Sequence, residues 1–234
     1  MIPAYGQAYK DCAENLRASI LEWHPDAAIT VLSELDLPYG DLGGQHNDWQ
    51  AFYASPYRQT IKLEADMWCA GPIDHWWPLL EQKDVVISQG CRDIYDRPSD
   101  CRHYRRMIDA NALPDVYNAI TYWRMSRQAK DFFDLVRNIF EHWNLYCSLL
   151  KFPDEIATTD TVYALAAEII GRESVTLPAH LGPNIVHMKK RVLGLINEDW
   201  TKELVWEKTG PGLRINTVAQ WGLVHYHIKE WAHG

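Results

Sequence analysis

Glu64 and Asp66 are the residues of this sequence whose type and spacing most clearly suggest chemistry. They follow a short β-prone run, Thr60 to Leu63, and one residue separates them. Because alternate side chains of an extended chain point the same way, both carboxylates can face one spot at the carboxyl end of a strand. That edge is where open α/β sheets bind ligands. Two convergent carboxylates suit a hard divalent ion, and such an ion suits a diphosphate, whereas two solvated loop acids are the ordinary alternative.

The elements that must position these acids begin with a β-α-β pattern. Residues 1–6 are typical of the end of a first strand, residues 9–23 have helical periodicity, and residues 28–32 are apolar and β-branched. Such a unit implies a right-handed crossover between parallel strands. The sequence therefore predicts an α/β fold with a mixed, mostly parallel central sheet flanked by helices.

Further along the chain, strand and helix patterns follow one another without an internal repeat or a linker. Strands are predicted at residues 59–63, 84–88, 116–124, 185–188 and 223–226, and helices at residues 49–54, 73–80, 126–150 and 158–170. Ser126 is the expected N-cap of the longest helix, and Gly171 is expected to end the last one. Residues 89–112 are expected to form a mobile segment over a site, and residues 196–221 to be irregular. We expect one domain over residues 1–234.

The composition limits the class of protein. The 234 residues are 47% hydrophobic and 23% charged, which is typical of a globular domain, and the net charge of −8 gives no general attraction to nucleic acid or anionic lipid. Eleven Trp and twelve Tyr can supply stacking surfaces as well as core. The five Cys are odd in number and lack a CxxC pair, so we expect reduced thiols. Without a signal-peptide pattern or an apolar run of about 20 residues, we expect a cytoplasmic protein with no membrane span.

Four stretches, in this order, resemble the nucleotide-sugar glycosyltransferases of the GT-A fold, especially small enzymes with a family-8-like layout. Residues 1–20 look like the opening strand, turn and helix that seat the nucleotide, and KLEADMW at residues 62–68 looks like the strand that ends in the D-x-D metal motif. LPDVYNAITYW at residues 113–123 looks like the strand that lines the donor-sugar pocket. GLVHYHIKEW at residues 222–231 looks like the C-terminal H-x-x-G-x-x-K-P-W segment. Together they span nearly the whole chain.

The resemblance implies a metal-dependent enzyme that moves a sugar from a nucleotide diphosphate sugar, expected to be a UDP-sugar, to an acceptor hydroxyl. Asp66 and Glu64 would bind Mn²⁺ (or Mg²⁺), and the longer Glu64 side chain could instead reach the ribose or a metal-bound water. His225 would be the third metal ligand, because Mn²⁺ accepts imidazole as well as oxygen. Lys229 would add a point charge at the diphosphate.

The resemblance also assigns roles around the donor and the acceptor. Tyr5 and Gly6 follow the first strand, where a ring can stack on the base and the backbone can approach the nucleotide. Asp115 and Asn118 would bind hydroxyls of the donor sugar. Asp160, at the start of an apolar helix, would face the acceptor as the general base of an inverting enzyme or bind sugar hydroxyls in a retaining one. An acid in a first helical turn is also favoured by the helix dipole alone.

The sequence departs from the family pattern at both metal-binding stretches. The first acid is Glu64 rather than Asp, and the C-terminal segment lacks the Gly and Pro of its model, so His187 and His227 rival His225 as the metal ligand. Two other functions therefore stay open. One is a nucleotidyltransferase acting on a sugar phosphate, although GQAYK at residues 6–10 is a poor version of the Gly-rich phosphate loop that such an enzyme usually has. The other is a nucleotide-sugar-binding module without catalysis, since a fold does not fix a function.

The resemblance divides the chain into a nucleotide-binding part at about residues 1–90 and an acceptor part at about residues 91–234. The acceptor is open between a hydroxymethylated pyrimidine in phage DNA and a glycan, because compact enzymes of this layout occur in bacteria and in their viruses. The acidic net charge weakens the DNA option. A local basic cluster could still hold phosphate, at Arg97, Arg102, Arg105 and Arg106.

Overall fold

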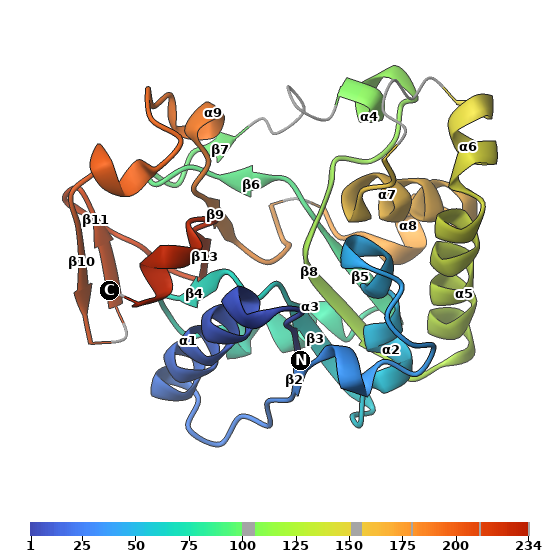
Figure 1. Ribbon diagram of the computed structural model, residues 1–234, viewed down its shortest axis with the longest axis horizontal. Coiled ribbons are helices and arrows are strands. Elements are labelled where there is room, and N and C mark those ends of the chain that lie inside the picture. Colours follow the sequence, from blue (N-terminus) through green and yellow to red (C-terminus); the bar gives the residue numbers. More distant parts are fainter. Residues whose placement is uncertain (100–105, 151–155, 179, 211, 234) are drawn as a thin grey trace.

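The computed structural model describes residues 1–99, 106–150, 156–178, 180–210 and 212–233. It is a mixed α/β structure whose strands form several sheets, with α5 and α7 at one end of the molecule and β10 and β11 at the other (Figure 1). The predicted single, mostly parallel central sheet is not what these residues form. The α/β class itself is confirmed.

The N-terminal β-α-β unit is confirmed. The strands β1 (Ile2–Pro3) and β2 (Val31–Leu32) pair in parallel, and the helix α1 (Gln7–Trp23) connects them. The second strand is shorter than predicted. Apolar side chains at helical spacing bury one face of α1 against β4 (Met67–Cys69), among them Cys12, Leu16 and Ile20.

A three-stranded antiparallel sheet carries the first candidate acids. Its strands are β3 (Gln59–Leu63), β8 (Val116–Arg124) and β5 (Val85–Gln89), in the order β3-β8-β5. The bounds predicted for β3 and β8 are confirmed. Both neighbours run antiparallel to β8, and every residue of β8 except Arg124 is buried, because helices cover this central strand.

Two helices pack on this part of the molecule. The helix α5 (Arg127–Glu141) begins at Ser126, whose side chain accepts a hydrogen bond from Ala129 N, so the predicted N-cap is confirmed. The helix α7 (Thr159–Ile170) ends at Gly171, with φ 99°, as predicted. The long predicted helix is wrong beyond His142, where the backbone leaves helical geometry and a separate helix follows, α6 (Trp143–Leu149).

A five-stranded mixed sheet joins distant parts of the chain. Its order is β4-β13-β9-β6-β7, with β13 (Leu223–His225), β9 (Ile185–His187), β6 (Cys91–Arg92) and β7 (Pro98–Ser99). The pairs β13–β9 and β9–β6 are parallel, and the pairs β4–β13 and β6–β7 are antiparallel. The short late strands were predicted, but their partners were not.

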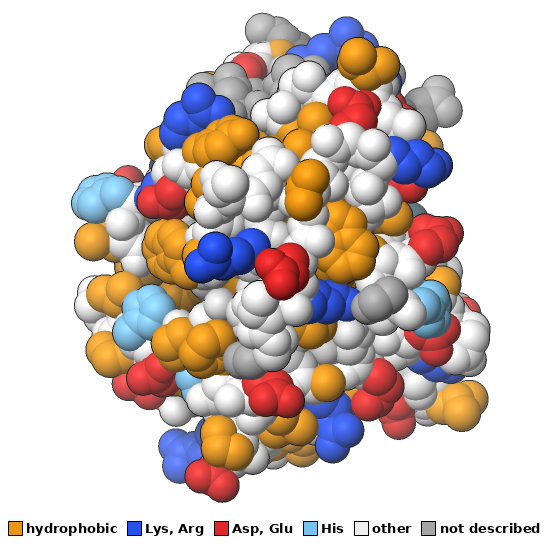
Figure 2. Space-filling model, turned by 90° about the vertical axis from the view of Figure 1, so that its left-hand side faces the viewer, with side chains coloured by type: hydrophobic (Ala, Val, Ile, Leu, Met, Phe, Trp, Pro, Cys, Tyr) orange, Lys and Arg blue, Asp and Glu red, His pale blue; other side chains and the backbone are white. Residues whose placement is uncertain are grey.

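The expectation of irregular structure over residues 196–221 is wrong. An antiparallel three-stranded sheet occupies much of it, with β10 (Trp206–Thr209), β11 (Gly212–Ile215) and β12 (Val218–Ala219). Short strands that alternate between half-buried and exposed positions give a weak sequence signal. Figure 2 shows the face of the molecule on this side, where acidic and basic side chains are scattered among apolar ones.

The remaining elements are short. The helices are α2 (Gln50–Ala54), α3 (Trp77–Leu80), α4 (Arg106–Ala110), α8 (Arg172–Val175) and α9 (Lys190–Leu193). Single 3-10 turns occur at Glu34–Asp36, Gly44–Asn47, Asp74–Trp76, Trp200–Lys202 and Lys229–His233.

The predicted mobile segment at residues 89–112 contains β6, β7 and α4, and two members of its basic cluster, Arg102 and Arg105, lie outside the described residues. Four of the cysteines are free thiols in the described chain: Cys12, Cys69, Cys91 and Cys147. Within the described ranges, no helix combines the length and apolar composition needed to cross a membrane.

Candidate metal and nucleotide site

Two segments far apart in the sequence meet where β3 ends. Glu64 and Asp66 lie in the link between β3 and β4, and β4 pairs antiparallel with β13 so that Met67 lies opposite His225. The backbone N–H of Tyr226 donates to the carbonyl oxygen of Asp66 (3.1 Å), which fixes the acidic link against the C-terminal segment. Strand pairing therefore brings the predicted acids to the predicted histidine.

The three predicted metal ligands form one compact group. Glu64, Asp66 and His225 offer two carboxylate oxygens and a ring nitrogen that all lie within 4.8 Å of one another. His225 Nε2 lies 3.1 Å from Asp66 Oδ1 and 3.3 Å from Glu64 Oε2. Lys229 Nζ lies 3.3 Å from the other carboxylate oxygen of Asp66. The group has the donor atoms and the spacing that a divalent cation needs.

The pKa values of the two acids are shifted in opposite directions. Burial raises the pKa of Glu64, and the negative charge of Asp66 raises it further against the opposing effect of His225. Burial also acts to raise the pKa of Asp66, but His225 and Lys229 outweigh it and hold that pKa well below its ordinary value. Burial acts to lower the pKa of Lys229, but the charges of Asp66 and Tyr9 and the hydrogen bonds to them together outweigh it, so this pKa is raised. As the pH falls, Glu64 therefore takes up a proton before Asp66 does, and Asp66 stays ionised at neutral pH.

A buried ion pair lies beside this group. Lys62 is 1% exposed, and its Nζ lies 2.5 Å from Asp48 Oδ1. The other oxygen of Asp48 accepts hydrogen bonds from Asn118 Nδ2 (3.0 Å) and from the Tyr163 hydroxyl (2.6 Å). An unpaired charge at this depth would be very costly, so these three partners are what allow the pair to stay buried.

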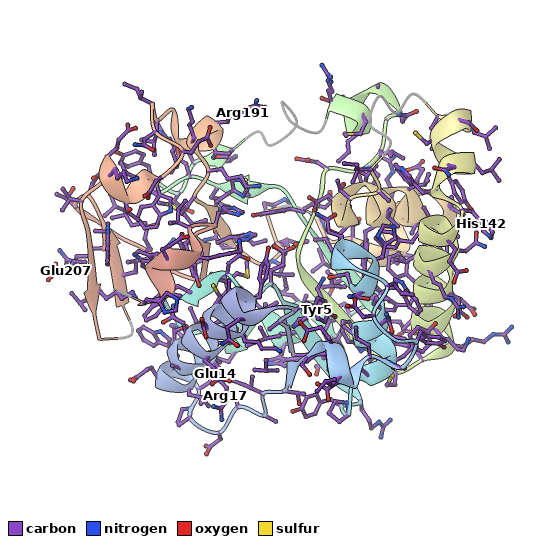
Figure 3. The ribbon with its side chains drawn as sticks, viewed as in Figure 1. Tyr5, Glu14, Arg17, His142, Arg191 and Glu207 are labelled. Carbon is purple, nitrogen blue, oxygen red and sulfur yellow. The ribbon has the colours of Figure 1, made fainter. Side chains whose placement is uncertain are left out.

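The carboxylate–histidine group, Lys229 and the pair of Lys62 and Asp48 border one cleft of about 490 Å³, a size that is typical of small-molecule sites. Six of the predicted site residues line it: Tyr5, Glu64, Asp66, Asp160, His225 and Lys229. Figure 3 shows Tyr5 just before the start of α1. Tyr9 also lines the cleft, and the Lys229 ammonium lies 4.5 Å from the centre of its ring.

Three further predicted residues are not among the described residues that line the cleft: Gly6, Asp115 and Asn118. Gly6 has φ 82°, and its N–H donates to the carboxylate of Glu34. The backbone N–H of Asn118 donates to Asp160 Oδ1 (2.7 Å), and its side chain binds Asp48. One oxygen of Asp160 is thus used within the protein, and a role as a base would need the other oxygen. The roles of these residues toward a ligand stay predictions.

The rival histidines are neighbours in space rather than alternatives. In the parallel pair of β9 and β13, His187 lies directly opposite His225. His227 stacks on His225 with ring centres 3.7 Å apart, and its Nε2 lies 3.4 Å from His187 Nδ1. Burial lowers the pKa of His227 most, and the positive charge of protonated His225 and His187 would lower it further, so this pKa lies well below its ordinary value. The His227 ring is therefore neutral at pH 7.

Tyr117 links two of these rings. Its hydroxyl oxygen lies 2.5 Å from His225 Nδ1 and 2.5 Å from His187 Nδ1. A phenol has one proton, so the hydroxyl donates to one ring and accepts from the other. If His225 Nε2 gives its lone pair to a cation, His225 Nδ1 keeps its proton and donates to Tyr117, which then donates to His187. Such a bond is how proteins fix the orientation of a metal-bound histidine.

Several of these residues were missed at the sequence level. Lys62 shared the available signal, because residues 62, 64 and 66 alternate along an extended segment and can face one side. Asp48 lies between the strand predicted at residues 28–32 and the helix predicted at residues 49–54, where no element is predicted. Tyr117 lay in a predicted strand, but only the pairing of β9 with β13 reveals its two histidine partners.

No protein-family model and no curated protein matches the chain. Among solved structures, the chain is similar to a crystal structure of the galactosyltransferase LgtC in complex with donor and acceptor sugar analogues. The two share 12% sequence identity over 97% of this chain and 87% of that chain, with a TM-score of 0.46. A likeness at that score does not establish a shared fold.

Proposed function

We propose that this chain is a metal-dependent glycosyltransferase that moves a sugar from a nucleotide diphosphate sugar to an acceptor hydroxyl. The observation that carries the proposal is the convergence of Glu64, Asp66 and His225 within 4.8 Å, at a cleft that Lys229 also lines. We treat residues 1–234 as one unit, because both the part before residue 90 and the part after it contribute to the cleft.

The donor set fits a divalent ion that accepts both oxygen and imidazole, and Mn²⁺ is the ion we propose. Asp66 is the main ligand, since its pKa is held low and its carboxylate is ionised. Glu64 and His225 complete the set. When bound, the ion neutralises the charge of a departing diphosphate. Lys229, 3.3 Å from Asp66, adds a second positive charge at the same place.

The rest of the cleft suits the remaining parts of a donor. The rings of Tyr5 and Tyr9 line it, and a nucleotide base can stack on such rings. Uridine as the base is proposed from the resemblance of the four sequence stretches alone. Asp160 also lines the cleft and is the carboxylate that we assign to the acceptor side, as a base or as a hydrogen-bond acceptor for hydroxyls.

A glycan hydroxyl is the acceptor that we favour over a hydroxymethylated pyrimidine in DNA. The net charge of −8 opposes binding to a polyanion. On the face shown in Figure 2, the Lys and Arg side chains are interspersed with acidic ones. A DNA-binding surface would gather its positive charge along the path of the phosphates.

The decisive test is hydrolysis of a panel of nucleotide sugars with and without Mn²⁺, measured as release of nucleoside diphosphate. We expect release from one UDP-sugar, dependent on Mn²⁺, and its loss in Asp66→Asn. Asp131→Asn, which changes an exposed acid on α5, is the matched control and should keep the activity. Pyrophosphate release from a nucleoside triphosphate would instead indicate a nucleotidyltransferase. Binding without turnover that survives Asp66→Asn would indicate a binding module.

A further inference from the structure

Three imidazoles gather on the side of His225 that faces away from the carboxylates. Ring nitrogens of His187, His225 and His227 lie within 4.8 Å of one another. Because His225 Nε2 faces Asp66 and Glu64, Nδ1 is the His225 atom on this side. His225 Nδ1 and His187 Nδ1 each lie 2.5 Å from the Tyr117 oxygen, so these two nitrogens are at most about 5 Å apart. His187 and His225 are almost fully buried, and His227 borders the cleft. The cluster is therefore enclosed but reachable from the cleft.

One separation within the cluster matches that between two ligands of a tetrahedral metal site. His227 Nε2 and His187 Nδ1 are 3.4 Å apart. Two ligands at the usual Zn–N distance of about 2.0–2.1 Å, at a tetrahedral angle, are separated by about 3.4 Å. Two neutral imidazole nitrogens at this separation need a proton or a cation between their lone pairs.

The backbone at His227 is strained so that its ring reaches this position. His227 has φ 61°, and the N–H of Ile228 donates to the carbonyl oxygen of Tyr226 (2.7 Å), which closes a three-residue turn around His227. This form of γ-turn is rare and unfavourable. It is held by Trp200 Nε1, which donates to the same carbonyl (2.8 Å), and by the bond from Tyr226 N to Asp66 O. Strain that the surroundings enforce at one residue is a common mark of a functional site.

We propose that His187, His225 and His227 form a second, nitrogen-rich cation site that takes Zn²⁺. Three imidazoles suit Zn²⁺ better than the hard ions that carboxylates prefer. A cation at His187 Nδ1 and His225 Nδ1 replaces the hydrogen bonds that these atoms make to the Tyr117 oxygen, and that oxygen is the nearest fourth donor.

The two cation sites share His225 and therefore compete. A neutral imidazole has one lone pair and one N–H, so a cation at Nδ1 leaves the proton on Nε2, which faces the carboxylates. A cation at Nε2 has the opposite effect. Zn²⁺ in the histidine site thus removes one ligand from the carboxylate site. This competition rests on the metal site of the proposed function, whereas the histidine site does not.

The test is Zn²⁺ binding to the whole chain after treatment with a chelator, with Zn²⁺ alone as the probe and no nucleotide present. Isothermal titration gives the affinity, and X-ray absorption of the unaltered protein counts the imidazoles around the zinc. We expect three imidazoles at about 2.0–2.1 Å. We expect Asp66→Asn to keep Zn²⁺ binding. We expect His227→Gly to weaken Zn²⁺ binding by tenfold or more, because even the loss of a group that only orients a metal ligand costs about tenfold in affinity. Glycine accepts the φ of residue 227, so this variant should fold.

His142→Ala removes a histidine at the end of α5, which lies at the far edge of the molecule from β10 in Figure 3, and should leave Zn²⁺ binding unchanged. Electron paramagnetic resonance of bound Mn²⁺ tests the competition, and Zn²⁺ should release Mn²⁺ less readily from His227→Gly. The proposed site would be overturned if X-ray absorption showed one imidazole or none around the zinc. It would also be overturned if Asp66→Asn lost Zn²⁺ affinity while His227→Gly kept it. Because no nucleotide is present, such a failure is separate from any failure of sugar transfer.

Discussion

Removal of the Tyr117 hydroxyl tests whether the neighbours of His225 orient it to bind a cation. Tyr117→Phe keeps the ring and deletes only the oxygen that lies 2.5 Å from Nδ1 of both His225 and His187. Tyr117 is 4% exposed, His225 3% and His187 0%, so water cannot readily replace the oxygen. In the Tyr117→Phe variant, the N–H of one imidazole loses its hydrogen-bond acceptor, and the lone pair of the other imidazole loses its hydrogen-bond donor.

The expected loss divides between stability and metal affinity. A buried polar group that loses its hydrogen-bond partner costs about 1–3 kcal/mol, which should lower the free energy of unfolding of the metal-free protein. Loss of the group that orients a metal-bound histidine typically costs about tenfold to hundredfold in affinity. That range corresponds to about 1.4–2.8 kcal/mol. We therefore expect Tyr117→Phe to bind Mn²⁺ about tenfold to hundredfold more weakly.

Isothermal titration with MnCl₂ measures the affinity, and urea unfolding of the metal-free protein measures the stability. The matched control is Tyr53→Phe, on α2, which also deletes a hydroxyl that donates to a side chain, the carboxylate of Asp134. Tyr53 is not among the described residues that line the cleft, so its variant should keep full Mn²⁺ affinity. A folded Tyr117→Phe that bound Mn²⁺ as tightly as the unaltered protein would refute this account of His225.

Three further predictions concern stability. Lys62→Met should cost about 3–5 kcal/mol in urea unfolding, because it leaves the buried carboxylate of Asp48 without its cation, and adding Asp48→Asn should restore part of the loss. Asp84→Asn should destabilise the protein at pH 7. A hydrogen bond from Ser126 and the charge of Arg124 hold the pKa of Asp84 below its ordinary value, so this difference should begin to shrink as pH falls below about 4 and vanish only below the lowered pKa. Gly171→Ala should cost about 1–2 kcal/mol, since φ is 99° and the added carbon meets no close neighbour.

The parts of the fold that could be predicted from the sequence are those with a strong local pattern. The bounds of β3 and β8 follow from runs of β-branched and aromatic residues, and the start of α5 and the end of α7 follow from Ser126 and Gly171. The pairing of the strands could not be predicted in the same way. The antiparallel order β3-β8-β5 depends on contacts between residues far apart in sequence, which no local period reports.

The same division applies to the candidate site. Glu64 and Asp66 were predicted from their alternation after a strand, and Lys62 lies on that same alternation. The cluster of His187, His225 and Tyr117 exists only because β9 and β13 pair in parallel next to the start of β8. The break at residue 142 has no Pro or Gly to announce it, so the helical pattern continued through it.

The central claim is that Glu64, Asp66 and His225 hold a divalent ion against a diphosphate. Anomalous X-ray diffraction at the manganese absorption edge, from crystals grown with Mn²⁺ and UDP, tests it most directly. We predict one strong anomalous peak within bonding distance of Asp66 Oδ1 and His225 Nε2, with diphosphate oxygens on its open side and the Lys229 ammonium beside them. UDP bound in the cleft with no manganese peak near these atoms would contradict the claim.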